Sequence, residues 1–187
     1  MSGPPTPEEE AQLVARAKQD PSAFGELYEL HFQRMYRFVY SRVRDQAVAE
    51  DVTSEVFMKA LRGIGRYQST GRPFVAWLYQ IALNAVADRY RSHKPTEDLE
   101  QQYDLSDGSS LEDLATHRDE LRRVWALVEQ LPAPQRTALV LKFQEDMKIE
   151  DIATAMGKSP GAVKLLVHRG VTRLRQHSAS DEFGVIA

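Results

Sequence analysis

Residues near the carboxyl end of the sequence have the spacing of a helix-turn-helix unit, whose chemistry is contact with duplex DNA. Residues 149–156 carry apolar side chains at helical spacing, and Gly157 can supply the positive φ of a tight turn. Ser159 is a natural N-cap, and Pro160 suits the first position of a second helix. Val163 is placed to fill the angle between the two helices. Because a helix held in this way can enter a major groove, the pattern predicts DNA binding.

The rest of the sequence offers little for catalysis or for metal binding. The 187 residues include no cysteine, so disulfides and thiolate metal sites are excluded. Five histidines show no ligand spacing and are expected on the surface or in grooves. No nucleophile–base–acid set and no phosphate-cradling glycine motif is found. We therefore expect a protein that is not an enzyme, with no catalytic residue, no metal and no cofactor.

Targeting signals are also missing from the sequence. The first residues lack the basic and apolar regions of a signal peptide. No apolar run approaches the roughly 18 residues needed to span a bilayer. These features predict a cytoplasmic protein without membrane insertion.

The net charge of −3 conceals an uneven distribution along the chain. Residues 1–95 carry 13 basic and 11 acidic side chains, and residues 121–187 carry 10 and 7. Between them, residues 96–120 hold nine acids and a single base, Arg118. Two mildly basic segments flank an acidic one, which also contains Gly and Ser and has little to bury. This organisation predicts two domains joined by a flexible acidic linker.

The elements that position the candidate residues are predicted to be helices only. No run of alternating β-branched residues lies between turn signals, as a strand would require. Ser22 is expected to cap the second helix, and Asp51, Glu55 and Lys59 to form an exposed stripe on the third. A loop with glycines is expected at 63–72. The helices are expected at about residues 8–19, 22–44, 46–62, 73–92, 112–130 and 133–145, followed by the helix-turn-helix pair.

Three motifs in series resemble a known family. Residues 49–61 look like region 2.2, residues 73–91 like regions 2.3–2.4, and residues 131–169 like region 4 of the sigma-70 RNA polymerase sigma factors. The order and spacing are those of the small extracytoplasmic-function (ECF) group, over about residues 20–176. The resemblance implies an all-α protein of two small helical domains, a region 2 bundle and a region 4 helix-turn-helix.

The resemblance also implies a domain plan and a function. Such a factor binds core RNA polymerase, recognises the minus-35 and minus-10 promoter elements and promotes transcription initiation. The implied plan is an N-terminal extension with the start of the first helix at 1–21, region 2 at 22–95, the acidic linker at 96–111, region 4 at 112–177 and a frayed tail at 178–187.

Site residues are carried over by position. Core polymerase docking is implied for Asp51 and Glu55, which could face one basic partner. Aromatic, basic and amide side chains are suited to binding an opened DNA strand, because bases stack on aromatic rings and phosphates pair with cations. The implied minus-10 residues are Arg66, Tyr67, Arg72, Asn84, Asp88 and Arg91, with Trp77 expected in the core rather than as a base platform. The implied minus-35 residues are Ser159, Gly161, Lys164, His168 and Arg169.

The sequence departs from the family pattern at the start of the second helix of the helix-turn-helix. After Val163 and Lys164 the family commonly shows Ser-Arg, whereas this chain has Leu165 and Leu166, so one groove cation is missing; Leu166 is expected in the core. The resemblance implies that the linker threads a channel of the polymerase and that an anti-sigma factor is a partner. The alternative is a conventional helix-turn-helix regulator, which binds duplex DNA without polymerase.

Overall fold

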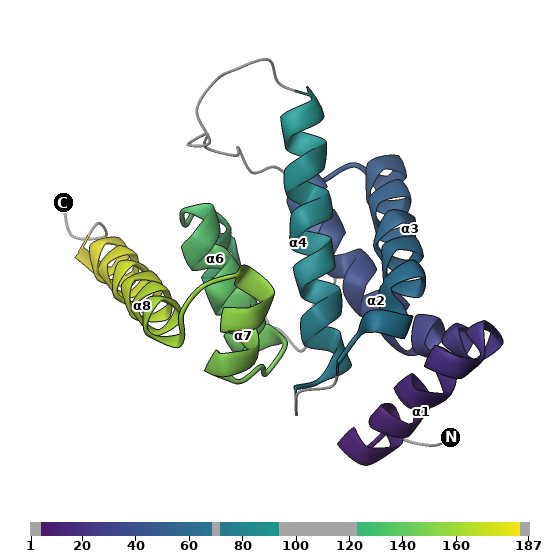
Figure 1. Cartoon of the computed structure of the whole chain (residues 1–187). Coiled ribbons are helices and arrows are strands. Elements are labelled where there is room, and N and C mark those ends of the chain that lie inside the picture. Colours follow the sequence, from purple (N-terminus) through teal and green to yellow (C-terminus); the bar gives the residue numbers. More distant parts are fainter. Residues whose placement is uncertain (1–4, 69–71, 94–122, 184–187) are drawn as a thin grey trace, which may run out of the picture. The chain divides into compact units, whose positions relative to one another are not determined.

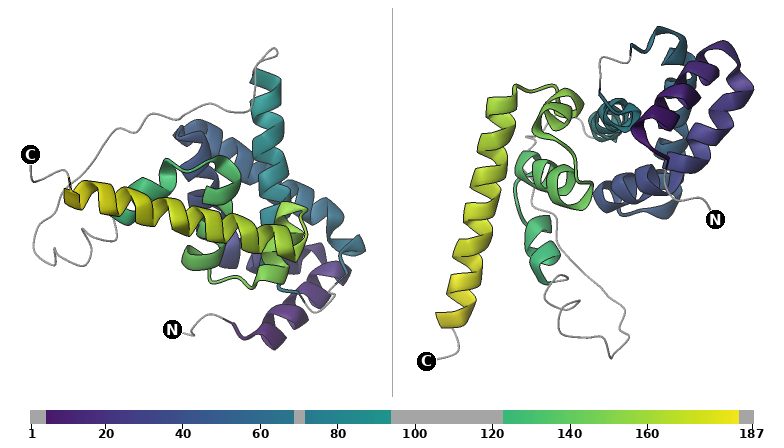
Figure 2. Two further views of the ribbon diagram at one scale, coloured as in Figure 1. Left: turned by 90° about the vertical axis from the view of Figure 1, so that its left-hand side faces the viewer. Right: turned by 90° about the horizontal axis from the view of Figure 1, so that it is seen from below.

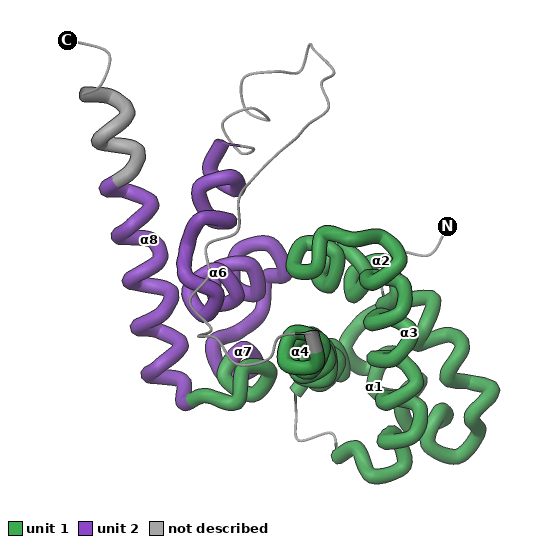
Figure 3. The backbone as a smooth tube through the Cα atoms, turned by 90° about the horizontal axis from the view of Figure 1, so that it is seen from above, with its two compact units in different colours: residues 1–96, 153–158 green, residues 97–152, 159–187 purple. Residues whose placement is uncertain are grey.

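The computed structural model describes residues 5–68, 72–93 and 123–183 (Figure 1). Within these ranges all regular structure is helical, which confirms the all-α prediction. The chain divides into two compact units, which Figure 3 colours separately. Unit 1 comprises residues 1–96 with 153–158, and unit 2 comprises residues 97–152 with 159–187. The linker expected at 96–111 lies outside the described residues.

Unit 1 begins with a well-capped helix. Helix α1 (Pro7–Gln19) starts with a capping box, in which the backbone amide of Thr6 donates to Glu9 Oε2 at 2.7 Å. Between α1 and the next helix, the prediction that Ser22 caps the second helix is wrong. The carboxylate of Asp20 instead accepts from the Ser22 backbone amide at 2.9 Å and opens the 3₁₀ turn η1 (Pro21–Ala23). The Ser22 hydroxyl and amide together lower the pKa of Asp20, so this corner is strongest when that carboxyl is ionised.

Three longer helices form the body of unit 1: α2 (Phe24–Val43), α3 (Gln46–Gly63) and α4 (Phe74–His93). They pack on one another, as the views of Figure 2 show. Their buried faces follow the helical period, which is why the sequence predicted them within two residues. The largest fully buried side chains here are Tyr79, Phe74, Leu27, Met35 and Leu78.

His31 is a correction to the expectation that the histidines lie on the surface or in grooves. Its side chain on α2 is buried, with 4% of the residue exposed. His31 Nε2 lies 2.9 Å from Glu10 Oε1 of α1, and its ring centroid lies 5.8 Å from that of Phe74. Burying a polar ring is costly without a polar neighbour, and the Glu10 carboxylate is that neighbour, although His31 Nε2 makes no hydrogen bond within the described residues. The pair therefore fixes α1 against α2.

Unit 2 contains a helix over residues 123–129, then α6 (Ala133–Leu139), the short π-helix η3 (Val140–Gln144) and α8 (Pro160–Phe183). Helix α7 (Ile149–Met156) precedes α8 and spans the division between the units. As predicted, Gly157 has a positive φ of 61°, and Ser159 Oγ caps α8 by accepting from the Ala162 amide at 3.2 Å. Val163 is fully buried, also as predicted.

Helix α8 is longer than expected. A frayed tail was predicted from residue 178, whereas the helix continues to Phe183. Residues 171–183 contain neither Gly nor Pro, so nothing in the sequence stops the helix there. Among the described residues, no helix combines the length and the apolar character that crossing a membrane requires.

Two glycines of α8 should respond oppositely to replacement by alanine. A Cβ on Gly170 would lie 2.9 Å from Leu139 Cδ1 of α6, and Leu139 is almost fully buried, whereas nothing lies within 4 Å of a Cβ on Gly161. We expect Gly161→Ala to stabilise unit 2 by up to about 1 kcal/mol. In Gly170→Ala the added methyl group should clash with Leu139. The cost should outweigh the gain in helix propensity and leave unit 2 less stable by about 1 kcal/mol.

The measurement is hydrogen exchange of α6 and α8 amides in the full-length protein, compared with the unsubstituted chain. Equal stabilisation by both substitutions would show that α6 and α8 are not in close contact at Gly170.

Candidate functional site

The outer face of α3 presents the acids that were predicted to dock on polymerase. Asp51 and Glu55 are one turn apart and both exposed, while Val52 and Val56, which directly follow them, are buried. Lys59 Nζ lies 2.6 Å from Glu55 Oε1, one turn further along. An exposed pair of this kind contributes about 0.5 kcal/mol, so it leaves the carboxylates available to a basic partner.

The outer face of α4 presents the three residues predicted to read the minus-10 strand. Asn84, Asp88 and Arg91 are all exposed on this helix. The Arg91 guanidinium donates to Asp88 Oδ1, and Lys59 Nζ of α3 lies 3.8 Å from Asp88 Oδ2. Asp88 is thus held between two cations, a geometry in which its carboxylate can orient Arg91.

These contacts join the two candidate faces. Glu55, Lys59, Asp88 and Arg91 form a continuous row of alternating charge, which we call the charge ladder. It runs from the acidic stripe of α3 to the basic end of α4. The sequence did not indicate this row, because Lys59 and Asp88 meet only through the packing of α3 on α4.

The turn after α3 builds a cluster of aromatic rings, which we call the aromatic shelf: Tyr67, Phe74 and Trp77. The Tyr67 ring lies 4.9 Å from that of Trp77 and 5.5 Å from that of Phe74, between centroids. Trp77 is half-buried rather than fully in the core, and a Cβ on Gly63 would approach it to 3.1 Å. Phe74 is buried beneath the other two rings, whereas Tyr67 and Trp77 are half-buried and reach solvent, so these two can stack unpaired bases.

Two predicted cations flank the aromatic shelf. Arg66 ends the 3₁₀ turn η2 (Ile64–Arg66) and is exposed, as is Arg72. The Tyr67 hydroxyl donates to the Arg72 carbonyl oxygen at 3.3 Å, which ties the two sides of this turn together. The predicted loop residues therefore lie around one aromatic surface, except for residues 69–71, which lie outside the described ranges.

In unit 2 the predicted minus-35 residues lie along the first turns of α8. Ser159, Gly161, Lys164, His168 and Arg169 are all exposed. The Ser159 hydroxyl is engaged as the N-cap of α8. Lys164, His168 and Arg169 project cationic or hydrogen-bonding groups from successive turns, the arrangement that a groove-reading helix uses.

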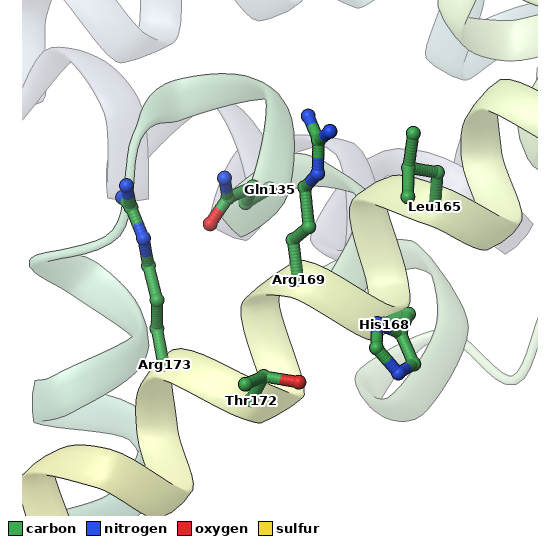
Figure 4. A pocket seen from close by; sticks show the side chains of 6 residues that line it. All are labelled: Gln135, Leu165, His168, Arg169, Thr172 and Arg173. Carbon is green, nitrogen blue, oxygen red and sulfur yellow. The ribbon is translucent and has the colours of Figure 1, made fainter.

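An open hollow of about 550 Å³ lies between α6 and α8 (Figure 4). His168 and Arg169 were predicted in this region. Thr172 and Arg173 also line the hollow and were missed, although they follow His168 and Arg169 by one helical turn. Leu165 is 47% exposed at its edge, and Leu166 is half-buried rather than in the core. The lining residues are Gln135, Leu165, His168, Arg169, Thr172 and Arg173.

The predicted sites thus fall into two sets. The docking and minus-10 residues all lie in unit 1, and the minus-35 residues all lie in unit 2. A chain that presents two separate candidate DNA surfaces differs from a single-module binder, because two tethered sites can engage one DNA together.

Family models match both halves of the chain. The model of Sigma-70 region 2 matches residues 27–96, and that of Sigma-70, region 4, matches residues 121–174. The matched segments contain every predicted site residue. The first contains α3, the aromatic shelf and α4, and the second contains α6 and most of α8.

Curated relatives and a solved structure agree with these matches. The chain is 36% identical over 179 residues to the ECF RNA polymerase sigma factor BldN of Streptomyces coelicolor, covering 91% of this chain and 66% of BldN. It is 34% identical over 175 residues to the ECF RNA polymerase sigma factor SigD of Mycobacterium tuberculosis, covering 89% and 82%. CnrH, solved in complex with the cytosolic domain of CnrY, has a TM-score of 0.66 at 25% identity, covering 92% of this chain and 98% of CnrH.

The two region matches and the relatives favour a sigma factor over a conventional helix-turn-helix regulator, because both halves of the chain match sigma-70 regions. Sigma factors are initiation factors and not enzymes. The chain therefore belongs to the ECF group of the sigma-70 family, the sigma factors that direct RNA polymerase to promoters.

Proposed function

We propose a division of labour between the surfaces of this sigma factor. Region 2 in unit 1 docks on core polymerase through α3 and holds the opened minus-10 strand on α4 and the aromatic shelf. Region 4 in unit 2 binds the minus-35 duplex with α8. The charge ladder carries this proposal, because it makes the docking and strand-binding faces of unit 1 neighbours.

Docking is assigned to Asp51 and Glu55. Both carboxylates are exposed on one stripe, and the helix beneath them is buried on its opposite face. Complementary charge across such an interface sets orientation and association rate. A basic helix of the polymerase is the partner that this stripe fits.

Strand binding is assigned to Arg66, Tyr67, Arg72, Asn84 and Arg91. Asn84 has both a donor and an acceptor, so it can read a base edge. Arg91, oriented by Asp88, pairs with a phosphate. Extruding a base costs a few kcal/mol, which the preformed aromatic shelf offsets by stacking.

Minus-35 binding is assigned to Gly161, Lys164, His168 and Arg169 on α8, with Ser159 at its start. The exposed Leu165 offers an apolar contact on the same helix. Its natural complement in a major groove is the methyl group of thymine.

Three further expectations follow from family membership. We expect the acidic segment at 96–111 to enter a positively charged channel of the polymerase. We expect an anti-sigma factor to bind the chain, since CnrH was solved with the cytosolic domain of CnrY. We expect the protein to act in the cytoplasm, where polymerase and promoter DNA meet.

The docking assignment predicts loss of function by charge reversal. Asp51→Lys with Glu55→Lys should abolish association with core polymerase and transcription from the promoter identified by transcript mapping after overexpression. Helix content should be unchanged, because both side chains are exposed. Co-purification with core polymerase and run-off transcription are the measurements. Glu29→Lys with Glu50→Lys, two exposed acids outside the stripe, is the matched control; survival of association in the first variant would remove α3 from the interface.

The minus-10 assignment separates specificity from affinity. Asn84→Ala should relax discrimination at one base by about 1–3 kcal/mol, because a base-edge hydrogen bond is lost. Arg91→Gln should weaken binding evenly across sequences, because a phosphate contact carries no sequence information. Holoenzyme binding to forked DNA with each base substituted in turn measures both. Unchanged base preference in Asn84→Ala would show that Asn84 does not read sequence.

The minus-35 assignment predicts an effect of Leu165 on specificity. Leu165→Ser should weaken binding to a site with thymine at the contacted position and leave other sites unchanged, since only the apolar contact is removed. Lys164→Gln should weaken binding to all sites alike. Holoenzyme binding to promoter fragments with altered minus-35 elements provides the measurement. Equal losses on every fragment for Leu165→Ser would exclude a thymine contact.

A further inference from the structure

Helix α1 brings a cation to the aromatic shelf that no sequence motif places there. Lys18 lies in the last turn of α1 and is exposed. Its Nζ lies 5.6 Å from the centroid of the Tyr67 ring. Helix α1 packs beside η2, at the start of the turn that carries the shelf (Figure 2).

The position of Lys18 is set by two anchors on α1. The contact between Glu10 and the buried His31 holds the first turn of the helix against α2. Nearer the end, the Arg16 guanidinium donates to Glu26 Oε1. A helix fixed at both points presents Lys18 to Tyr67 as a consequence of its period, because Lys18 follows Arg16 by two residues and faces another side.

The ammonium group is available to a stronger partner than the ring. Within the part of the chain that the structure describes, no carboxylate forms an ion pair with Lys18. An exposed contact between a lysine and an aromatic face is weak, and a phosphate attracts an ammonium more strongly. The four-carbon stem of lysine lets the charge move from the ring to a nearby anion.

The surroundings of Lys18 define that anion. Arg66 directly precedes Tyr67, and the carbonyl of Arg72 accepts from the Tyr67 hydroxyl. Both arginines are exposed, so with Lys18 three cationic residues adjoin this ring. Rings that stack bases next to cations that pair with phosphates are the features of a single-strand binding surface. An acidic peptide would use the cations and leave the rings without a partner.

We propose that Lys18 of α1 binds the phosphate backbone of the unpaired minus-10 strand while a base stacks on the aromatic shelf. The proposal rests on the strand-binding role proposed for the shelf and extends that site to α1. Lys18 covers the Tyr67 ring in the free protein and is transferred to the phosphate when the strand binds.

The test compares Lys18→Gln, Lys18→Arg and Arg16→Gln in full-length protein assembled with core polymerase. Binding to forked promoter DNA with an unpaired minus-10 strand is measured between 0.1 and 1 M NaCl. One phosphate contact on a single strand contributes about 0.7 to the slope of log K against log salt. We expect Lys18→Gln to lose about that much slope. The loss of affinity caused by the substitution should then be about fivefold larger at 0.1 M NaCl than at 1 M NaCl.

The other variants separate a contact from a structural effect. Arg16→Gln removes the same charge and one anchor of α1; because the contact of Glu10 with His31 and the buried Val14 and Ala17 still hold the helix, it should keep the wild-type slope. Lys18→Arg keeps the charge and should restore binding. An unchanged slope in Lys18→Gln, or an equal loss in Arg16→Gln, would overturn the proposal. Failure of the unsubstituted holoenzyme to bind the fork would instead refute the strand-binding role of the shelf itself.

Discussion

The burial of one apolar stripe on each of α3 and α4 is the constraint on which the surfaces of unit 1 depend. Val52, Val56 and Ala60 on α3, and Ala82 and Ala85 on α4, are buried. Their small size lets the two helices approach closely. Because a helix repeats every 3.6 residues, burying one stripe turns the opposite stripe to solvent. The polar residues of both helices are therefore exposed as a geometric consequence of the core.

Close packing of α3 on α4 also explains how an acidic protein can present a nucleic-acid surface. The chain has a net charge of −3, and Asp88 lies within the candidate strand-binding face. Its negative charge is balanced locally, since Arg91 and Lys59 lie on either side of it. The carboxylate then orients a cation instead of repelling phosphate. Net charge averaged over the chain is a poor guide to such a surface, because charges act over about a Debye length of 8–10 Å.

Much of the fold could be read from the sequence because helical periodicity is local. Helix α3 was expected at 46–62 and spans Gln46–Gly63, and the turn at Gly157 has the predicted positive φ. Two predictions from local sequence patterns, the cap at Ser22 and the surface position of His31, were wrong. Ser22 does not cap α2, because its amide and hydroxyl donate to the Asp20 carboxylate two residues earlier, which caps the 3₁₀ turn η1 instead. His31 was expected on the surface or in a groove, yet it is buried; no sequence pattern indicated this, because the neighbouring Glu10 lies on another helix.

By itself, the sequence determined the helices, their exposed stripes, the helix-turn-helix and the three motifs that identify the family, since each depends on residues within a few turns of one another. The tertiary structure alone decided which stripes became neighbours. Lys59 with Asp88, Lys18 with Tyr67, and Gly170 with Leu139 are pairs from different helices. Such pairs depend on how helices cross, which is set by the close packing of whole faces and has no local signature in the sequence.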